Sequence, residues 1–316
     1  MVGYLFNRIV QSIPVLIGVT LVVFAMMHIA PGDPAQAMLG PMATEENLAA
    51  IRHQLGLDRP LWAQYVTWVG NAARGDLGES ISMATPVRPE VMTRFGASLL
   101  LGAAAFAIAG ITGIVIGVAT ALRRGSAFDR LVTLLTTAGI SMPPFYLGML
   151  LIVAFSFKLN LFPMSGMYST QGYSGIGDLL SHLVLPALTL AAAPLTVIAR
   201  MTRSSVLEQI NEDYVRTARA KGLTGSAVVT GHVLKNALIP VIHLLGLQVG
   251  FLLSATALVE VVFSWPGLGD LLVNAVLARD LPLIQGGILV IALVYVITNI
   301  VTDTIHAAVD PRLHQK

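Results

Sequence analysis

The chain has 316 residues, of which 55% are hydrophobic and only 11% are charged. Such a composition leaves too little polar surface to coat a water-soluble domain of this length, so it indicates a membrane protein. The net charge of +2 does not by itself favour any class of protein or partner. The absence of cysteine excludes disulfides, thiolate metal sites, iron–sulfur ligation and cysteine nucleophiles.

Six apolar runs predict six transmembrane helices, because each has roughly the 20 residues needed to cross a bilayer. The first run follows Arg8, and Ala35-Gln36-Ala37 resembles a leader cleavage site. A leader has an apolar region of only about 7–15 residues, so we expect an uncleaved span. Pro143-Pro144 in the third run and Pro186 and Pro194 in the fourth predict bends. The runs cover residues 9–29, 99–122, 131–157, 183–199, 238–263 and 284–305.

The longest polar stretch, residues 30–95, combines acidic and basic residues with several aromatic residues. A helical pattern begins near Thr44 and ends at Gly56, and another begins at Pro60, with Leu61, Tyr65 and Trp68 on one face. This stretch predicts a small helical domain at the membrane surface.

Lysine and arginine residues are denser in one set of alternating connections, which comprises both termini, residues 123–130 and residues 200–235. Positively charged short loops stay in the cytoplasm, so both termini are expected there. The long first loop and residues 160–181 are then expected outside.

The most informative connection covers residues 203–237. Within it, residues 211–213 favour a helix start, three basic residues load the later turns, and Gly222 favours the end. Tyr214, Val215 and Ala218 are predicted to form an apolar side. Two explanations are open on these grounds: a loop attracted to anionic lipid, or a docking element for a soluble partner. The basic residues are Arg216, Arg219 and Lys221.

The string from Glu212 and Asp213 through Gly222, followed by Lys235-Asn236-Ala237-Leu238-Ile239-Pro240, resembles the cytoplasmic coupling loop of binding-protein-dependent transport permeases. Ala218 and Gly222 match the family pattern. Arg216 replaces the acidic residue of the general motif, Thr217 replaces its first alanine, and Lys235 replaces its closing proline. These departures look typical of the peptide and nickel branch.

Four further motifs, in the family's order, look like permeases for dipeptides, oligopeptides and glutathione. They are Pro31-Gly32-Asp33-Pro34, Gln54-Leu55-Gly56-Leu57-Asp58, Gly75-Asp76-Leu77-Gly78 and Ser264-Trp265-Pro266-Gly267-Leu268-Gly269. The resemblance implies an all-α subunit of a type I ATP-binding-cassette importer in the bacterial cytoplasmic membrane. It implies an N-terminal span over 1–30, an extracytoplasmic helical insertion over 31–95, the permease domain over 96–306 and a cytoplasmic tail over 307–316.

The resemblance also implies partners: a second permease, two cytoplasmic ATPases and an external substrate-binding protein. No Gly-x-x-x-x-Gly-Lys-Ser/Thr phosphate loop occurs in the sequence, so the chain is not expected to be an enzyme, and ATP and Mg belong to the ATPases. No metal-ligand spacing is present. Nucleic acid is not expected as a partner.

Polar residues within membrane spans are costly, so several are candidates for a translocation path or gate. For Gln248, a hydrogen bond to a neighbouring helix is the favoured explanation. The candidates are Pro143, Pro144, Gln248, Ser254, Glu260 and Trp265.

A short peptide is the expected substrate, with glutathione and a nickel chelate left open. Two other classes are weaker. Gly267-Leu268-Gly269-Asp270 fits an intramembrane aspartyl protease, but Asp270 lies in a connection and Asp303 at the opposite face. A secondary transporter predicts ionisable residues deep in the spans, whereas Glu260 and Asp303 are terminal.

Overall fold

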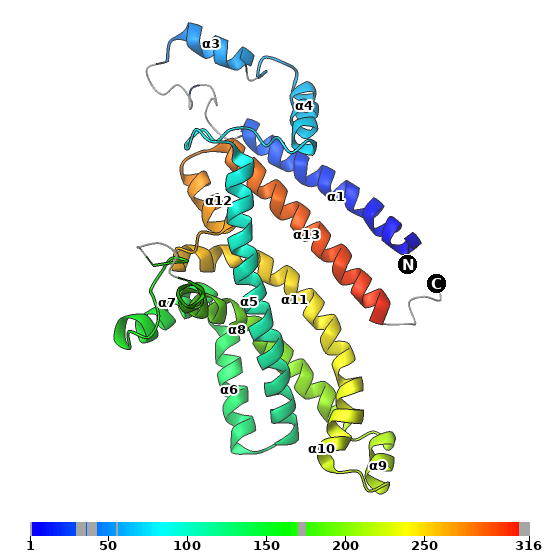
Figure 1. Ribbon diagram of the computed structural model, residues 1–316. Helices are drawn as coiled ribbons and strands as arrows, with labels where there is room; N and C mark the ends of the chain where they lie inside the picture. Colours follow the sequence, from blue (N-terminus) through cyan, green and yellow to red (C-terminus); the bar gives the residue numbers. More distant parts are fainter. Residues whose placement is uncertain (1, 30–35, 37–42, 55, 170–174, 310–316) are drawn as a thin grey trace. The chain divides into compact units, whose positions relative to one another are not determined.

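The computed structural model describes residues 2–29, 36, 43–54, 56–169 and 175–309, and all the named elements in these ranges are helices (Figure 1). The chain divides into two compact units. The first comprises residues 1–96 and 267–300, and the second comprises residues 97–266 and 301–316. One long helix, α5 (Val87–Leu122), contributes its first turns to the first unit and the remainder to the second.

In the first unit, α4 (Leu61–Ala73) packs against α1 (Val2–Ile29) through aromatic rings. Phe24 lies 5.4 Å from Tyr65 and 6.2 Å from Trp68, between ring centroids. The hydroxyls of Thr20 and Tyr65 are 2.9 Å apart. The aromatic face expected of residues 60–68 therefore packs on α1. Leu61, by contrast, is exposed.

The remaining helices of the first unit are α3 (Glu45–Gln54), α12 (Leu268–Leu277) and α13 (Leu281–Val309), of which residues up to 300 belong here. The start of α5 packs with α12 and α13 around a small apolar core. Sequence reasoning predicted no helix at α12. The core residues are Val87, Val91, Leu268, Leu271, Ala275, Leu283 and Val290.

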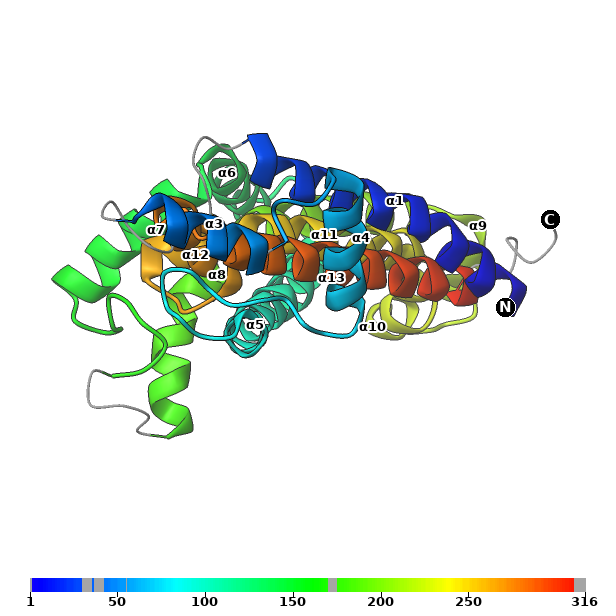
Figure 2. The ribbon, with the colours of Figure 1, turned by 90° about the horizontal axis from the view of Figure 1, so that it is seen from above.

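The second unit contains the main apolar core, formed by α5, α8 and α11, which lie side by side in both ribbon views (Figures 1 and 2). Gly117 of α5 allows a close approach to α8, because a Cβ there would lie 2.5 Å from Cβ of Thr202. The elements are the rest of α5, α6 (Ala127–Ser141), α7 (Pro144–Leu151), η1 (Ile152–Lys158), α8 (Ile176–Gln209), α9 (Asp213–Ala220), α10 (Gly225–Val228), η2 (Val229–Val233) and α11 (Leu234–Phe263).

Five of the described helices are long and apolar enough to cross a membrane, and two bent helix pairs raise this number to seven if each pair is one span. The six expected spans fall within that range. The third run, residues 131–157, is not one continuous helix, because α6 and the α7–η1 segment meet at 113°. The break lies at Met142-Pro143-Pro144, where proline cannot donate a backbone hydrogen bond.

Candidate functional site

The helix α9 lies where the sequence predicted a helix between residues 211 and 222. Glu212 is the N-cap and Asp213 occupies the first turn, where a carboxylate interacts favourably with the helix dipole. Arg219 lies in the last turn, where a positive charge is favourable for the same reason. The charge order along the sequence therefore agrees with the helix direction.

Gly222 ends α9 in a left-handed conformation, with φ of +82°. Its N–H donates to the carbonyl of Arg219 at 2.9 Å, and the N–H of Leu223 donates to the carbonyl of Ala218 at 3.4 Å. These paired bonds are the Schellman pattern, which places glycine at the left-handed position. A side chain at residue 222 would find open space, so its cost would come from the backbone conformation alone.

The buried side of α9 consists of Val215 and Ala218, which are 0% and 6% exposed. They pack into a small apolar cluster from the ends of α5, α8 and α11 together with α10 and η2. Tyr214 does not belong to this side, although the sequence predicted that it would. It is 37% exposed, and its hydroxyl donates to Oε1 of Gln209 at 2.7 Å. The rest of the cluster is Ala121, Val206, Val228, Val233 and Ala237.

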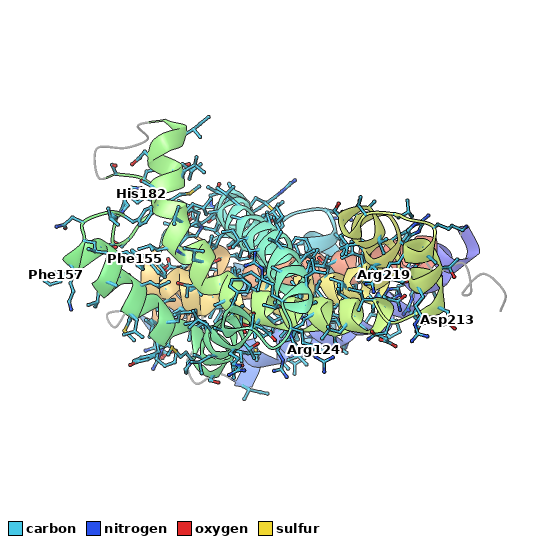
Figure 3. All side chains as sticks on the ribbon, turned by 90° about the horizontal axis from the view of Figure 1, so that it is seen from below. Arg124, Phe155, Phe157, His182, Asp213 and Arg219 are labelled. Carbon is cyan, nitrogen blue, oxygen red and sulfur yellow. The ribbon has the colours of Figure 1, made fainter. Side chains whose placement is uncertain are left out.

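The other sides of α9 are exposed and carry most of its charge (Figure 3). Arg216 donates to Asp213 at 3.3 Å, an ion pair between two largely exposed side chains that contributes little to stability. Arg219 and Lys221 are also exposed. Apolar contacts thus hold α9 on its own subunit, and its basic residues are exposed on the other side.

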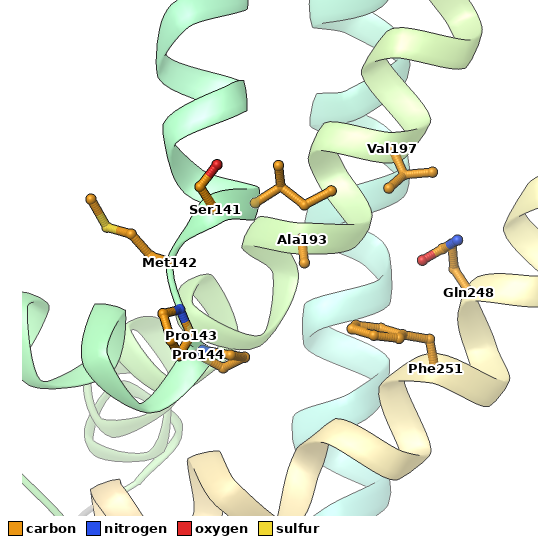
Figure 4. Close-up of a pocket in the computed structure, with 9 residues that line it drawn as sticks. Ser141, Met142, Pro143, Pro144, Ala193, Val197, Gln248 and Phe251 are labelled. Carbon is orange, nitrogen blue, oxygen red and sulfur yellow. The ribbon is translucent and has the colours of Figure 1, made fainter.

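Three of the candidate path residues meet at one pocket of about 410 Å³ in the second unit (Figure 4). Pro143 and Pro144 come from the break between α6 and α7, and Gln248 comes from α11. The break in the third apolar run thus forms part of the pocket wall. The other lining residues are Ile140, Ser141, Met142, Ala193, Val197 and Phe251.

Glu260 and Trp265 do not line this pocket, and both side chains are fully buried in the second unit. The hydroxyl of Ser98 donates to Oε1 of Glu260 at 2.6 Å, and the indole N–H of Trp265 donates to the carbonyl of Ala97 at 2.9 Å. Both hydrogen bonds fasten the end of α11 to α5. The side chain of Ser254 lies outside the described residues. The gating role of Glu260 and Trp265 stays a prediction.

Sequence reasoning missed a buried carboxylate at Asp280, in the first unit. Its Oδ2 accepts hydrogen bonds from the hydroxyl of Ser80 and from the N–H and hydroxyl of Ser82, and its Oδ1 accepts the N–H of Leu283. Burial acts to raise the pKa of Asp280, but these hydrogen bonds outweigh it and hold the pKa below its usual value. The sequence did contain a signal for this residue: an aspartate directly before an apolar run favours the N-terminus of a helix.

A second missed carboxylate, Asp129 in the second unit, lies in the first turn of α6 and is 5% exposed. Its Oδ1 accepts a hydrogen bond from Nε of Arg203 on α8 at 3.0 Å, and its Oδ2 accepts one from Nη2 at 2.9 Å. This bidentate pair ties the start of α6 to α8.

Comparison with known families decides what kind of protein carries this arrangement. Residues 113–315 match the family described as "Binding-protein-dependent transport system inner membrane component". The chain belongs to this family. Residues 1–100 match the corresponding N-terminal family, "Binding-prot-dependent transport system membrane comp, N-term". The chain is therefore a multi-pass inner-membrane permease, and its resemblance to this family in sequence is confirmed.

Three curated permeases are similar over the full length of both chains. The Di/tripeptide transport system permease protein DppB of Pseudomonas aeruginosa (strain UCBPP-PA14) is 45% identical. The Dipeptide transport system permease protein DppB of Escherichia coli (strain K12) is 42% identical. The Glutathione transport system permease protein GsiC of the same Escherichia coli strain is 43% identical.

Two solved structures share the permease's fold. One is an amino acid ABC transporter with histidines, at a TM-score of 0.52 and 15% identity, with 71% of this chain and 94% of that chain covered. The other is the inward-facing MetNI methionine ABC transporter, at 0.52 and 19%, with 69% and 97% covered. At these identities the likeness shows the fold alone, which is that of a type I ABC importer membrane subunit. The predicted fold class is confirmed.

Proposed function

We propose that this permease is one of two different membrane subunits of an importer for short peptides, driven by two separate ATPase subunits. The names and 42–45% identities of the dipeptide permeases support a peptide substrate. Glutathione is the alternative, because a glutathione permease is 43% identical. A nickel chelate is a more distant alternative within the same architecture. An external binding protein would deliver the substrate.

The observation that carries the proposal is the two-sided environment of α9. Its apolar side, Val215 and Ala218, rests on the ends of three long helices, whereas its basic side is exposed. A partner that grips the exposed side would push directly on α5, α8 and α11. This is the contact that an ATPase needs in order to transmit its closure to the membrane.

Two further features support ATP hydrolysis by partners. The sequence contains no phosphate-binding loop of the Gly-x-x-x-x-Gly-Lys-Ser/Thr type. Arginine and lysine are densest in the connections around α9 and between α5 and α6, which favours the cytoplasmic side for both. Both termini would then be cytoplasmic, and ATP with Mg would be bound by the partners.

The pocket at the α6–α7 break is the proposed part of the path that belongs to this subunit. Gln248 offers an amide that can donate to or accept from a peptide group, while the surrounding side chains are mostly apolar. A site of this kind suits varied peptides because it adds little side-chain specificity.

The first test is purification of the tagged permease from gently solubilised membranes, with mass spectrometry of its partners and an ATPase assay. We expect a second permease and ATPases, with ATP hydrolysis stimulated by the binding protein loaded with dipeptide. Loading with glutathione or a nickel chelate instead distinguishes the alternatives. A permease that emerges alone and transports in liposomes without ATP would refute the proposal in favour of a secondary transporter.

The second test separates docking from transmission at α9. Arg219→Glu reverses a charge on the exposed side and should release the ATPases. Val215→Ala leaves that side intact but loosens its contact with the long helices, so ATPases should stay bound while hydrolysis no longer drives uptake. Gly222→Ala strains the end of α9 by roughly 1 kcal/mol and should also uncouple ATP hydrolysis from uptake. The control is Arg59→Glu, an equivalent reversal in the long first loop; equal losses there would contradict the role of α9.

A further inference from the structure

The turn between α5 and α6, in the second unit, is closed by local hydrogen bonds. Gly125 adopts a φ of +81°, and the hydroxyl of Ser126 caps α6 by accepting the N–H of Asp129 at 3.2 Å. The Asp129 carboxylate in turn accepts the N–H of Gly125 at 2.9 Å. The backbone of the turn is therefore fixed by its own side chains.

The single carboxylate of this turn is already neutralised. Arg203 of α8 reaches across with the bidentate pair described above and occupies both oxygens of Asp129. A bidentate guanidinium pair has a defined geometry and is stronger than an exposed ion pair. The hydrogen bonds of Asp129 therefore go to α8 and to the backbone of the turn, and its interaction with the arginines of the turn is limited to a coulombic one with Arg124.

Three arginines surround the turn: Arg123, Arg124 and Arg130, here called the basic tip. All three are exposed, and none forms an ion pair with a carboxylate in the described part of the chain. The guanidinium carbon of Arg123 lies 5.3 Å from the ring centroid of Phe128, and Nη2 of Arg130 donates to the carbonyl of Gly125 at 3.3 Å. Their positive charges thus lie at the turn with no carboxylate in an ion pair to any of them among the described residues.

An apolar stripe starts directly at the basic tip and runs along α6. Phe128, Leu131 and Leu135 follow the i, i+3, i+7 spacing of one helix face, and they are 38%, 56% and 61% exposed. Arg123 stacks on the first of them, so its charge sits where the apolar surface ends. Arginine behaves in this way at a membrane interface, where the stem contacts apolar groups and the head reaches polar ones.

We propose that the basic tip binds the phosphate headgroup of an anionic phospholipid, with an acyl chain lying along Phe128, Leu131 and Leu135. The surface offers a net positive charge next to exposed apolar side chains, and these two parts complement the headgroup and the acyl chain of an anionic lipid. Arginine suits a phosphate because its planar donors match the phosphate oxygens. An acidic protein surface would match the charges but would leave the apolar stripe unexplained. The inference is independent of the transported substrate.

The consequence reaches α9, because the turn between α5 and α6 and the helix α9 lie at the same end of the second unit (Figure 1). A bound lipid would hold the α5–α6 turn, and through Asp129 and Arg203 it would hold α8 as well. The last turns of α8 contribute Val206 to the cluster under α9. Anionic lipid would therefore stabilise the apolar cluster on which α9, the proposed contact for the ATPases, packs.

The test measures phosphatidylglycerol on the assembled transporter by native mass spectrometry and in nanodiscs titrated against phosphatidylcholine. The test variant is Arg123→Gln, Arg124→Gln and Arg130→Gln together. A charge-preserving variant changes the same residues to Lys. The matched control changes Arg59, Arg74 and Arg88 to Gln, which removes the same number of charges in the first unit.

We expect the glutamine variant to bind phosphatidylglycerol about fivefold more weakly for each arginine lost, the ratio that corresponds to ~1 kcal/mol. The lysine variant should retain most of the binding, and the control should equal the wild type. Unchanged binding in the glutamine variant would overturn the proposal. So would a glutamine variant that keeps its lipid but releases the ATPases, because the basic tip would then be a protein contact. The proposal would also be overturned if the glutamine variant lost as much binding to phosphatidylcholine as to phosphatidylglycerol.

Discussion

Two buried aspartates, one in each compact unit, perform the same structural task by different chemistry. Asp280 joins residues 80 and 82 to the start of α13, some 200 positions away, and Asp129 joins the start of α6 to α8, 74 positions away. Asp280 is held by hydroxyl and amide N–H donors, which are neutral. Asp129 is held mainly by a guanidinium, which is charged.

The difference determines what each aspartate leaves to its surroundings. Neutral donors stabilise the carboxylate of Asp280 without cancelling its charge, so its contribution depends on ionisation. Arg203 takes both oxygens of Asp129 in a bidentate pair, so none of the neighbouring arginines forms an ion pair with it. One carboxylate is therefore stabilised by neutral donors and the other by a charged one. The four predictions below alter one site or the other.

The largest effect is expected from Asp280→Ala. This change removes the acceptor from four donors in a fully buried position, so the donors lose their partners and α13 loses its cap. We expect a loss of about 3 kcal/mol in the free energy of unfolding. Thermal unfolding of the purified permease in a mild detergent measures it.

The control for this change is Asp76→Ala, which lies in the same compact unit. Asp76 is exposed, and its carboxylate accepts the N–H of Gly78 at 3.0 Å. Its removal should cost about 1 kcal/mol or less, because water replaces the lost acceptor. Equal losses at the two positions would show that burial of Asp280 is not the source of its effect.

The sequence alone predicted the elements that depend on local chemistry. The start and end of α9 followed from charge order and Gly222, and the interruption at Pro143-Pro144 followed from the missing N–H of proline. The 113° angle between α6 and α7 did not follow, because packing with other helices determines it. Tyr214 was assigned to the wrong side of α9, since its polar hydroxyl has a partner at Gln209.

Contacts between distant segments were beyond sequence reasoning. Nothing in the pattern around Ser80 indicates a bond to Asp280, because serine hydroxyls have no periodic signature and their partners are 200 positions away. Similarly, Pro143, Pro144 and Gln248 were separate candidates until the structure brought them to one pocket, while Glu260 lay elsewhere. Composition identified the residue types suited to a path but not their grouping.

A smaller effect is expected from Arg203→Lys, which keeps the charge but loses the planar pair of donors. A lysine can make only one of the two bonds to Asp129 in this geometry. We expect a lower unfolding temperature, with roughly half the loss of Asp280→Ala, and weaker coupling of ATP hydrolysis to uptake in the assembled transporter. If Arg203→Lys equals the wild type in both measurements, charge alone explains the pair.

Acid should weaken the contribution of Asp280 to the stability of the first unit. Because the pKa of Asp280 in the folded protein lies below its usual value of 3.8, its contribution is complete above that value and is lost as the pH falls through the lower one. The difference in unfolding temperature between the wild type and Asp280→Asn should be constant above about pH 5 and should narrow below about pH 4. A difference that is unchanged down to pH 3 would contradict the role of ionisation.

The smallest effect is expected from the two serines that hold Asp280. Ser80 is 3% exposed, donates to Asp280 and accepts the N–H of Met83 at 3.0 Å, so Ser80→Ala breaks two bonds in a buried place. Ser82→Ala removes one hydroxyl at an exposed residue whose N–H still donates to Asp280 at 2.9 Å. Unfolding free energies should fall by about 1.5 kcal/mol for Ser80→Ala and about 0.5 kcal/mol for Ser82→Ala. A larger loss of unfolding free energy for Ser82→Ala than for Ser80→Ala would contradict this prediction. The exposed serine would then contribute more to holding Asp280 than the buried one.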